Sequence, residues 1–173
     1  MDIVFQMLGS RGYELGERLD DGILFKRGVH RIFVSSIISD SIQVKFIDMF
    51  VKILQLYNIN HGIAIYKNAV SSSVRSKIES MDTKLELLNM NQLSCNIMDH
   101  YLQPRFIRCD SAQAIEAKKL YIYPMPIISR EDATVLWMGW GVGDIISICE
   151  KKCQNSLDYK GQCCIDCRHR RVL

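Results

Sequence analysis

Five cysteines and a histidine lie close together near the end of the chain, and they are the residue types most able to bind a metal. They are Cys149, Cys153, Cys163, Cys164, Cys167 and His169. Cys164 and Cys167 have the spacing of half a tetrahedral zinc site, which other members of the group could complete. Alternation along a strand would instead place Cys163 and Cys167 on one face and Cys164 on the other, as small buried apolar side chains lie. We favour the second interpretation, predict no metal and no other cofactor, and keep a free-standing zinc-binding module as the alternative.

Three charged residues could form the centre of a metal-dependent nuclease. Such a centre needs acidic side chains that converge at strand ends, with a lysine nearby, to hold a divalent ion and a water molecule. Lys84 and Glu86 share one face of an expected strand, and Asp82 comes just before it. No second strand supplies another acidic position, and His61 and His100 are better explained as hydrogen-bonded structural histidines. We therefore expect no active site in this chain.

Glycines at three alternate positions, Gly139, Gly141 and Gly143, could suggest a phosphate-binding loop. Such a loop leads from a strand into a helix. Here an expected helix leads into an expected strand, so we interpret the glycines as a helix C-cap followed by a turn. Trp137 and Trp140 beside them are then packing or interface residues rather than a base-stacking platform.

The composition is that of a folded protein with no strong attraction to nucleic acid. Hydrophobic residues make up 48% of the chain and charged residues 24%, enough to bury a core. Residues 150–173 carry six Lys/Arg against three Asp/Glu, which accounts for the whole net charge of +3. A free-standing nucleic-acid-binding protein would show a broad basic face instead. Because no long apolar run or secretion signal is apparent, we expect a soluble intracellular protein with reduced thiols.

The first half alternates between strand and helix patterns. A β-branched run predicts a strand over 31–38, and polar residues recurring at helical spacing predict a helix over 41–57, capped by residues 39–41. A strand over 62–66, a short helix with Val74, Ile78 and Met81 on one face, and a strand over 85–89 follow. This β-α-β-α-β order predicts an N-terminal α/β domain with a small, mostly parallel sheet.

The second half has separate helix signals and two prolines. Asp110 and Gln113 have the spacing of a capping box for a helix ending near residue 120. Pro124 and Pro126 then interrupt regular structure. Residues 129–132 predict a helix start and Gly139 a helix stop, before a strand over 145–149 to which 162–167 could pair. We expect an α+β protein with an N-terminal domain (1–100), a connector (101–123) and a small α+β C-terminal domain (124–173).

Three stretches resemble one protein family. The first is Phe5-x-Met7-Leu8-x-x-Arg11-Gly12-Tyr13, and the second is Asn96-Ile97-x-x-His100-x-x-x-Pro104. The third runs from Met125-Pro126-Ile127-Ile128 through Asp132, Trp137 and Gly139 to Gly143-Asp144-Ile145-Ile146 and Ile148. In this order and spacing they resemble the jaw-and-assembly subunit common to eukaryotic-type DNA-directed RNA polymerases, a family that also has an archaeal counterpart. The α/β pattern lies where that family has its jaw domain.

The resemblance implies a non-catalytic part of a transcription machine. It implies that the N-terminal jaw lies along downstream duplex DNA, that the C-terminal domain docks on the largest polymerase subunit, and that other polymerase subunits are partners. The residues it assigns to assembly are Pro126, Asp132, Trp137, Gly139, Gly143 and Asp144. The residues it assigns to the hinge are Asn96, His100 and Pro104. The location it implies is the nucleus, or the virion and host cytoplasm if a large DNA virus encodes the protein.

The resemblance has departures that concern the partner surface. Ala133 and Leu136 stand where the family has proline and arginine, and Glu150 stands where it has an arginine. A contact made by the family's arginine therefore does not carry over to Leu136. For the DNA we expect at most weak phosphate contacts, with Arg11, Lys26 and Arg27 as the candidates among residues that are usually solvated.

Overall fold

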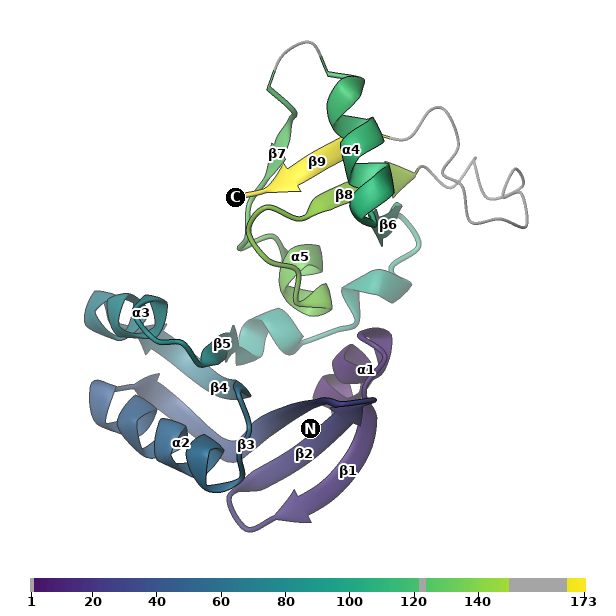
Figure 1. Ribbon diagram of the computed structural model, residues 1–173. Coiled ribbons are helices and arrows are strands. Elements are labelled where there is room, and N and C mark those ends of the chain that lie inside the picture. Colours follow the sequence, from purple (N-terminus) through teal and green to yellow (C-terminus); the bar gives the residue numbers. More distant parts are fainter. Residues whose placement is uncertain (1, 122–123, 150–167) are drawn as a thin grey trace. The chain divides into compact units, whose positions relative to one another are not determined.

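The computed structural model describes residues 2–121, 124–149 and 168–173, and it contains two compact units (Figure 1). The N-terminal unit covers residues 1–96 and the C-terminal unit residues 97–173. Each unit has its own sheet together with helices, so the protein is α+β, as expected. Among the described residues, no helix is both long and apolar enough to cross a membrane.

The N-terminal unit is built from three helices, a five-stranded sheet and one 3-10 turn. Along the chain these are α1 (Asp2–Ser10), β1 (Glu14–Leu19), β2 (Gly22–Arg27), β3 (His30–Ile42), α2 (Val44–Leu56), β4 (His61–Val70), α3 (Ser72–Glu79), β5 (Lys84–Asn89) and η1 (Met90–Leu93). The order of strands in the sheet is β1-β2-β3-β4-β5.

This sheet is mixed, and the prediction of a mostly parallel sheet was wrong. The pairs β3/β4 and β4/β5 are parallel, as the β-α-β-α-β pattern predicts, but β1/β2 and β2/β3 are antiparallel. The antiparallel half comes from two tight hairpins, with Leu19 opposite Gly22 and Arg27 opposite His30. A two-residue loop can join only antiparallel strands.

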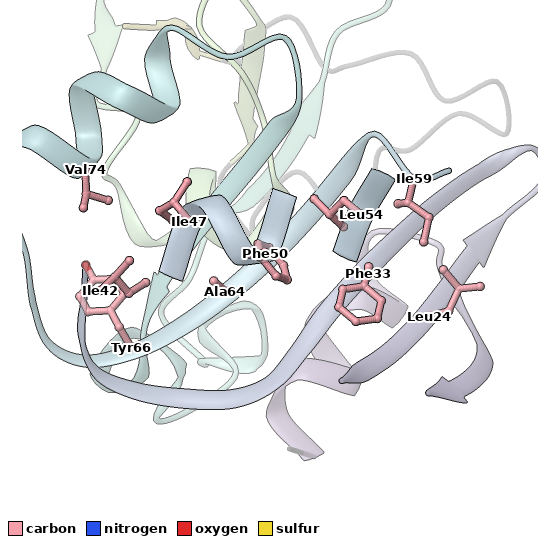
Figure 2. Close-up of a cluster of buried hydrophobic side chains, with 10 residues drawn as sticks. All are labelled: Leu24, Phe33, Ile42, Ile47, Phe50, Leu54, Ile59, Ala64, Tyr66 and Val74. Atoms are coloured by element: carbon pink, nitrogen blue, oxygen red, sulfur yellow. The ribbon is translucent and has the colours of Figure 1, made fainter. Parts of the chain in front are cut away.

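Helices pack on both faces of the sheet. On one face, α2 and α3 enclose an apolar core that Figure 2 shows; its residues are Leu24, Phe33, Ile42, Ile47, Phe50, Leu54, Ile59, Ala64, Tyr66 and Val74. Strand residues with the opposite parity, such as Phe25 and Ile63, are also buried. Phe5 of α1 packs against Phe25 in a T-shaped, edge-to-face contact with 5.3 Å between ring centroids, so α1 covers the second face. The unit therefore has three layers.

The start of α2 differs from its predicted cap. Residues 39–41 belong to β3, and α2 begins after Gln43, whose side chain makes no capping hydrogen bond. The apolar spacing of α2 is as predicted, because Ile47, Phe50 and Leu54 are all buried. Burial of this stripe, rather than a capping side chain, therefore fixes the position of the helix.

The C-terminal unit is a four-stranded sheet with two helices and a 3-10 turn. Its elements are η2 (Ile97–Asp99), β6 (Arg105–Arg108), α4 (Ser111–Lys119), β7 (Ile127–Ile128), α5 (Ala133–Met138), β8 (Ile145–Cys149) and β9 (Arg168–Val172). The order of strands is β6-β8-β9-β7, with β6/β8 and β8/β9 antiparallel and β7/β9 parallel.

Several local predictions for this unit are confirmed. Asp110 and Gln113 form the reciprocal capping box of α4, Gly139 ends α5 in the left-handed conformation at φ 67°, and β8 has the predicted bounds. Residues 101–123, expected to be a connector, contain β6 and α4, and β6 is hydrogen-bonded to β8 in the sheet. The strand predicted over 162–167 lies outside the described residues, and the partner of β8 on its other side is β9.

Gly62, near the start of β4, is required by the close approach of α2. A Cβ at this position would lie 2.7 Å from Leu54 Cδ1 and 2.7 Å from Phe50 Cε1. Both neighbours are fully buried in the core of Figure 2 and have little room to move. The sequence therefore needs glycine here for packing.

We predict that Gly62→Ala lowers the free energy of unfolding by about 1–3 kcal/mol, because the extra methyl group overpacks the core. Gly9→Ala is the matched control, since nothing lies within 4 Å of a Cβ in that exposed part of α1. It should be neutral or stabilising by about 0.5–1 kcal/mol, the helix preference for alanine. Urea denaturation of both variants measures the difference, and equal effects would contradict the packing argument.

Candidate functional site

Three of the predicted assembly residues shape helix α5. The Asp132 carboxylate accepts a hydrogen bond from the Thr134 backbone N–H at 2.9 Å and so caps the helix. Trp137 is buried on the helix, and Gly139 provides the left-handed residue at its end. These residues determine where α5 begins and ends and which side it buries.

The other three assembly residues hold the edges of the C-terminal sheet. Gly143, at φ 93°, donates its N–H to the Val172 carbonyl at 3.0 Å. Asp144 accepts from the Gly141 N–H at 2.9 Å and pairs with Arg108 Nη2 at 2.9 Å. The Pro126 carbonyl accepts the Arg171 N–H at 2.9 Å. The six residues thus have structural roles; Trp137 is buried, whereas Pro126 and Gly143 are exposed.

Exposed apolar side chains are concentrated in the C-terminal unit. Of the twelve large apolar side chains exposed in the described chain, seven belong to this shorter unit. They are Tyr101, Leu102, Ile115, Leu120, Ile127, Val142 and Leu173. Exposed apolar surface of this kind often marks a site of protein contact.

Three of these side chains are Ile127, Val142 and Leu173, and we call them the apolar rim. They belong to three segments that backbone hydrogen bonds connect at the end of β9. The Leu173 N–H donates to the Ile128 carbonyl at 3.1 Å, and the Gly143 N–H donates to the carbonyl of Val172. These bonds bring the turn before β8 and strand β7 to the same end of β9. Val142 is 66% exposed there.

The predicted hinge residues lie at and after the change from one unit to the other. Asn96 is the last residue of the N-terminal unit. His100 Nδ1 accepts the Leu102 N–H at 3.3 Å, so this histidine is hydrogen-bonded, as expected. Pro104 precedes β6. Sequence reasoning missed Gln103, whose side-chain amide donates to Thr134 Oγ1 at 2.7 Å and links this stretch to α5.

Arg11, one of the three candidates for a weak phosphate contact, lies in the interior of the N-terminal unit. Its side chain is only 4% exposed, and Nη1 donates to Glu86 Oε2 on β5 at 2.8 Å. Gly12 follows α1, and its positive φ of 77° allows the chain to turn after the helix. Because a buried guanidinium needs a carboxylate partner, Arg11 holds α1 to β5 and does not face solvent.

Glu86 is the centre of a polar network that also contains His61 and Lys84. Its second oxygen, Oε1, lies 2.7 Å from His61 Nε2 and 3.4 Å from Lys84 Nζ. Burial alone would raise the pKa of Glu86, but the His61 hydrogen bond and the charges of Arg11, His61 and Lys84 outweigh it and lower the pKa to about 2. The carboxylate is therefore ionised at neutral pH, and its two oxygens contact all three of these basic side chains.

Lys26 and Arg27, the other candidates for DNA contact, are the last two residues of β2. Lys26 Nζ pairs with Glu17 Oε1 at 3.1 Å. Arg27 Nη1 donates to the Arg11 carbonyl at 2.8 Å, and its guanidinium lies 4.6 Å from the centre of the Tyr13 ring. Both side chains already have protein partners, and their contact with DNA stays a prediction.

The constellation proposed for a nuclease does not hold a metal-binding arrangement. The Glu86 carboxylate is already bonded to the basic side chains around it, and Asp82 is exposed in the loop before β5. Across residues 2–121, 124–149 and 168–173, no group of three or more His, Cys, Asp or Glu is placed to hold a metal ion.

Most of the predicted cysteine cluster lies outside the described residues. Cys153, Cys163, Cys164 and Cys167 belong to that part of the chain. Cys149 is buried at the end of β8, and its Sγ lies 3.8 Å from Ser147 Oγ. His169 on β9 lies opposite Ser147 on β8, so its side chain is on the same face of the sheet as that of Cys149. Partial burial lowers the pKa of His169. Zinc binding stays a prediction.

Comparison of the chain with models of known protein families gives no match.

We predict that Glu86 makes stability depend on acid pH. Its folded-state pKa of about 2 is below the ordinary 4.5, so its contribution is complete above about pH 4.5 and is lost as the pH falls toward 2. The shift corresponds to roughly 3 kcal/mol. In Glu86→Gln this acid-dependent loss should disappear, and stability at pH 7 should fall by about 3–5 kcal/mol because Arg11 loses its partner.

Denaturant unfolding from pH 7 to pH 2 measures this effect. Glu14→Gln is the control, because Glu14 is an exposed carboxylate of the same unit. It should keep the wild-type pH dependence. If Glu86→Gln and the wild type lose stability in parallel between pH 4.5 and 2, the assignment to Glu86 is wrong.

Proposed function

We propose that this protein is a non-catalytic subunit of a multi-subunit DNA-directed RNA polymerase. Its C-terminal unit docks on the largest subunit, and its N-terminal unit lies along downstream DNA during transcription. The main support is the third motif, from Pro126 to Asp144, whose residues have the positions and spacing of the family's assembly domain. Each of these residues has a defined role in the fold of the C-terminal unit.

The surface of the C-terminal unit supports docking on a protein. The apolar rim gathers large side chains that a monomer would leave in water, next to the turn that Gly143 and Asp144 hold in place. A docking site of this kind gains most of its affinity from a few apolar side chains that lose water on binding. The rim is therefore the part of the surface on which we expect the largest subunit to dock.

The charge distribution supports a secondary role in DNA contact. Residues 1–149 carry equal numbers of acidic and basic residues, because the net charge of +3 arises after them. The N-terminal unit has eleven Lys/Arg against ten Asp/Glu, and so small a net charge is too little to hold a duplex by phosphate contacts alone. A unit that guides DNA within a larger complex can rely on other subunits for those contacts, with Lys26 and Arg27 as minor contributors.

We predict that the affinity-tagged protein, isolated from the lysate of its native source, brings down the large polymerase subunits. Val142→Asp should reduce their recovery at least about tenfold, equivalent to about 1.4 kcal/mol, because a charge would enter the docked interface without a partner. Mass spectrometry of the bound fraction measures both results. Circular dichroism shows whether the variant is folded.

Val29→Asp is the matched control for this experiment. Val29 also follows a glycine in a turn and is 91% exposed, but it belongs to the N-terminal unit. It should leave recovery of the polymerase subunits unchanged. Absence of polymerase subunits with the wild-type protein would exclude the proposed function, and equal loss with both variants would exclude the apolar rim as the docking site.

The zinc-binding alternative has one observation in its favour. Cys149 and His169 share a face of the sheet, and they flank the stretch of sequence that holds the other four cysteines of the cluster. Metal analysis of the purified protein separates the two functions. One zinc ion per chain would favour the binding module, and a clearly lower content would exclude it.

A further inference from the structure

A polar pocket of about 210 Å³ lies on the N-terminal unit at the start of strands β3 and β4. Val29 and Ile59 contribute its apolar part, and the remaining lining residues are polar. These polar residues are Tyr13, His30, Arg31, Asn58, Asn60 and His61. They come from the end of α1, the β2–β3 hairpin and the loop between α2 and β4. Segments distant in sequence thus form one concave polar surface.

Hydrogen-bonding groups in this pocket remain available for a ligand. The Arg31 guanidinium uses Nη2 to bond the Asn58 carbonyl at 2.7 Å, and it forms no ion pair with a described carboxylate. The Tyr13 hydroxyl, the His30 ring and the Asn60 amide have no hydrogen-bond partner within residues 2–121, 124–149 and 168–173. One strong cationic donor therefore lines the pocket together with three further polar side chains.

His61 is fixed at the pocket by the buried network. Its Nε2 is bonded to Glu86 Oε1 at 2.7 Å, which orients the ring. Its Nδ1 has no partner in the described part of the chain. The loop that brings Asn60 beside it is also fixed, because the Lys84 N–H donates to the Asn60 carbonyl at 2.9 Å. The pocket wall is thus held in place before any ligand binds.

Several basic side chains lie close to this pocket, although the N-terminal unit as a whole carries eleven Lys/Arg against ten Asp/Glu. Arg11, Arg27, Arg31 and Lys84 lie in or next to the pocket wall. The carboxylate in contact with this wall is Glu86, and it is 15% exposed and bonded to Arg11, His61 and Lys84. A negative ligand in the pocket would be attracted by the Arg31 guanidinium, the charged group that lines it.

We propose that this pocket binds a phosphate group. The arginine fork of Arg31 suits two phosphate oxygens at once. The Tyr13 hydroxyl and the Asn60 amide can donate to the remaining oxygens. The His30 ring can contact the side of the phosphate that these groups leave uncovered. The source of the phosphate can be a free nucleotide or a nucleic-acid backbone, and the proposal stands whether or not the chain belongs to a polymerase.

The test is a titration of the purified full-length chain with three probes at constant ionic strength. The probes are inorganic phosphate, adenosine monophosphate and a short DNA duplex, with chloride as the reference anion. Imidazole resonances of His30 and His61, assigned with His30→Gln and His61→Gln, report occupancy of the pocket. The expected result is a saturable change in these resonances with at least one probe.

Variants show whether the binding belongs to this pocket. Arg31→Gln should weaken binding at least about tenfold, and Arg31→Lys should recover part of the loss, because it restores the charge without the fork. Lys52→Gln is the matched control, since it removes one exposed positive charge from α2 away from the pocket. It should change affinity less than about twofold. His30→Gln removes a side chain with no bond to the described residues, so it tests the pocket with little risk to folding.

The outcomes decide both the proposal and the source of the phosphate. Binding of phosphate or the nucleotide that depends on Arg31 supports a free ligand, and binding of the duplex alone that depends on Arg31 supports a nucleic-acid backbone. Equal weakening by Lys52→Gln and Arg31→Gln would overturn the proposal, because it would show attraction to net charge alone. Absence of saturable binding with all three probes would also overturn it.

Discussion

The N-terminal unit depends on a buried ion pair between residues that are far apart in the chain. Arg11 follows helix α1 and Glu86 lies on β5, and their atoms Nη1 and Oε2 are 2.8 Å apart. Removing either partner would leave a charge in the interior, which is much more costly than losing a surface contact. The pair therefore fixes where α1 ends against the sheet. It also fixes His61, and through His61 and the neighbouring loop it determines the wall of the polar pocket.

Sequence reasoning succeeded where the determining interaction is local. The capping box of Asp110 and Gln113, the Gly139 stop and the apolar stripe of α2 each lie within about two turns of chain, so residue type and spacing are sufficient to identify them. The bounds of β8 follow in the same way, because a glycine turn precedes a short run of apolar residues.

Sequence reasoning failed where the determining interaction is distant. Arg11 and Glu86 are 75 positions apart, and a solvated arginine is the ordinary expectation for such a residue. Nothing near Arg11 in the sequence indicates its carboxylate partner. The antiparallel half of the sheet was missed for a different reason, because the hairpin that joins β2 to β3 was not weighed as a turn, although Gly28 in its loop has a positive φ of 57°.

The residues that resemble the family motif and the proposed docking surface are separate features of the C-terminal unit. Asp132 still caps α5 although Ala133 stands where the family has proline, because the cap bond goes to the Thr134 N–H and needs nothing from residue 133. The turn at Asp144 is likewise held within the unit, by Gly141 and Arg108. An exposed neighbour such as Val142 can therefore change without disturbing the bonds that shape the unit. This separation is compatible with a chain that resembles the motif in order and spacing but has Leu136 at the position of the family's arginine.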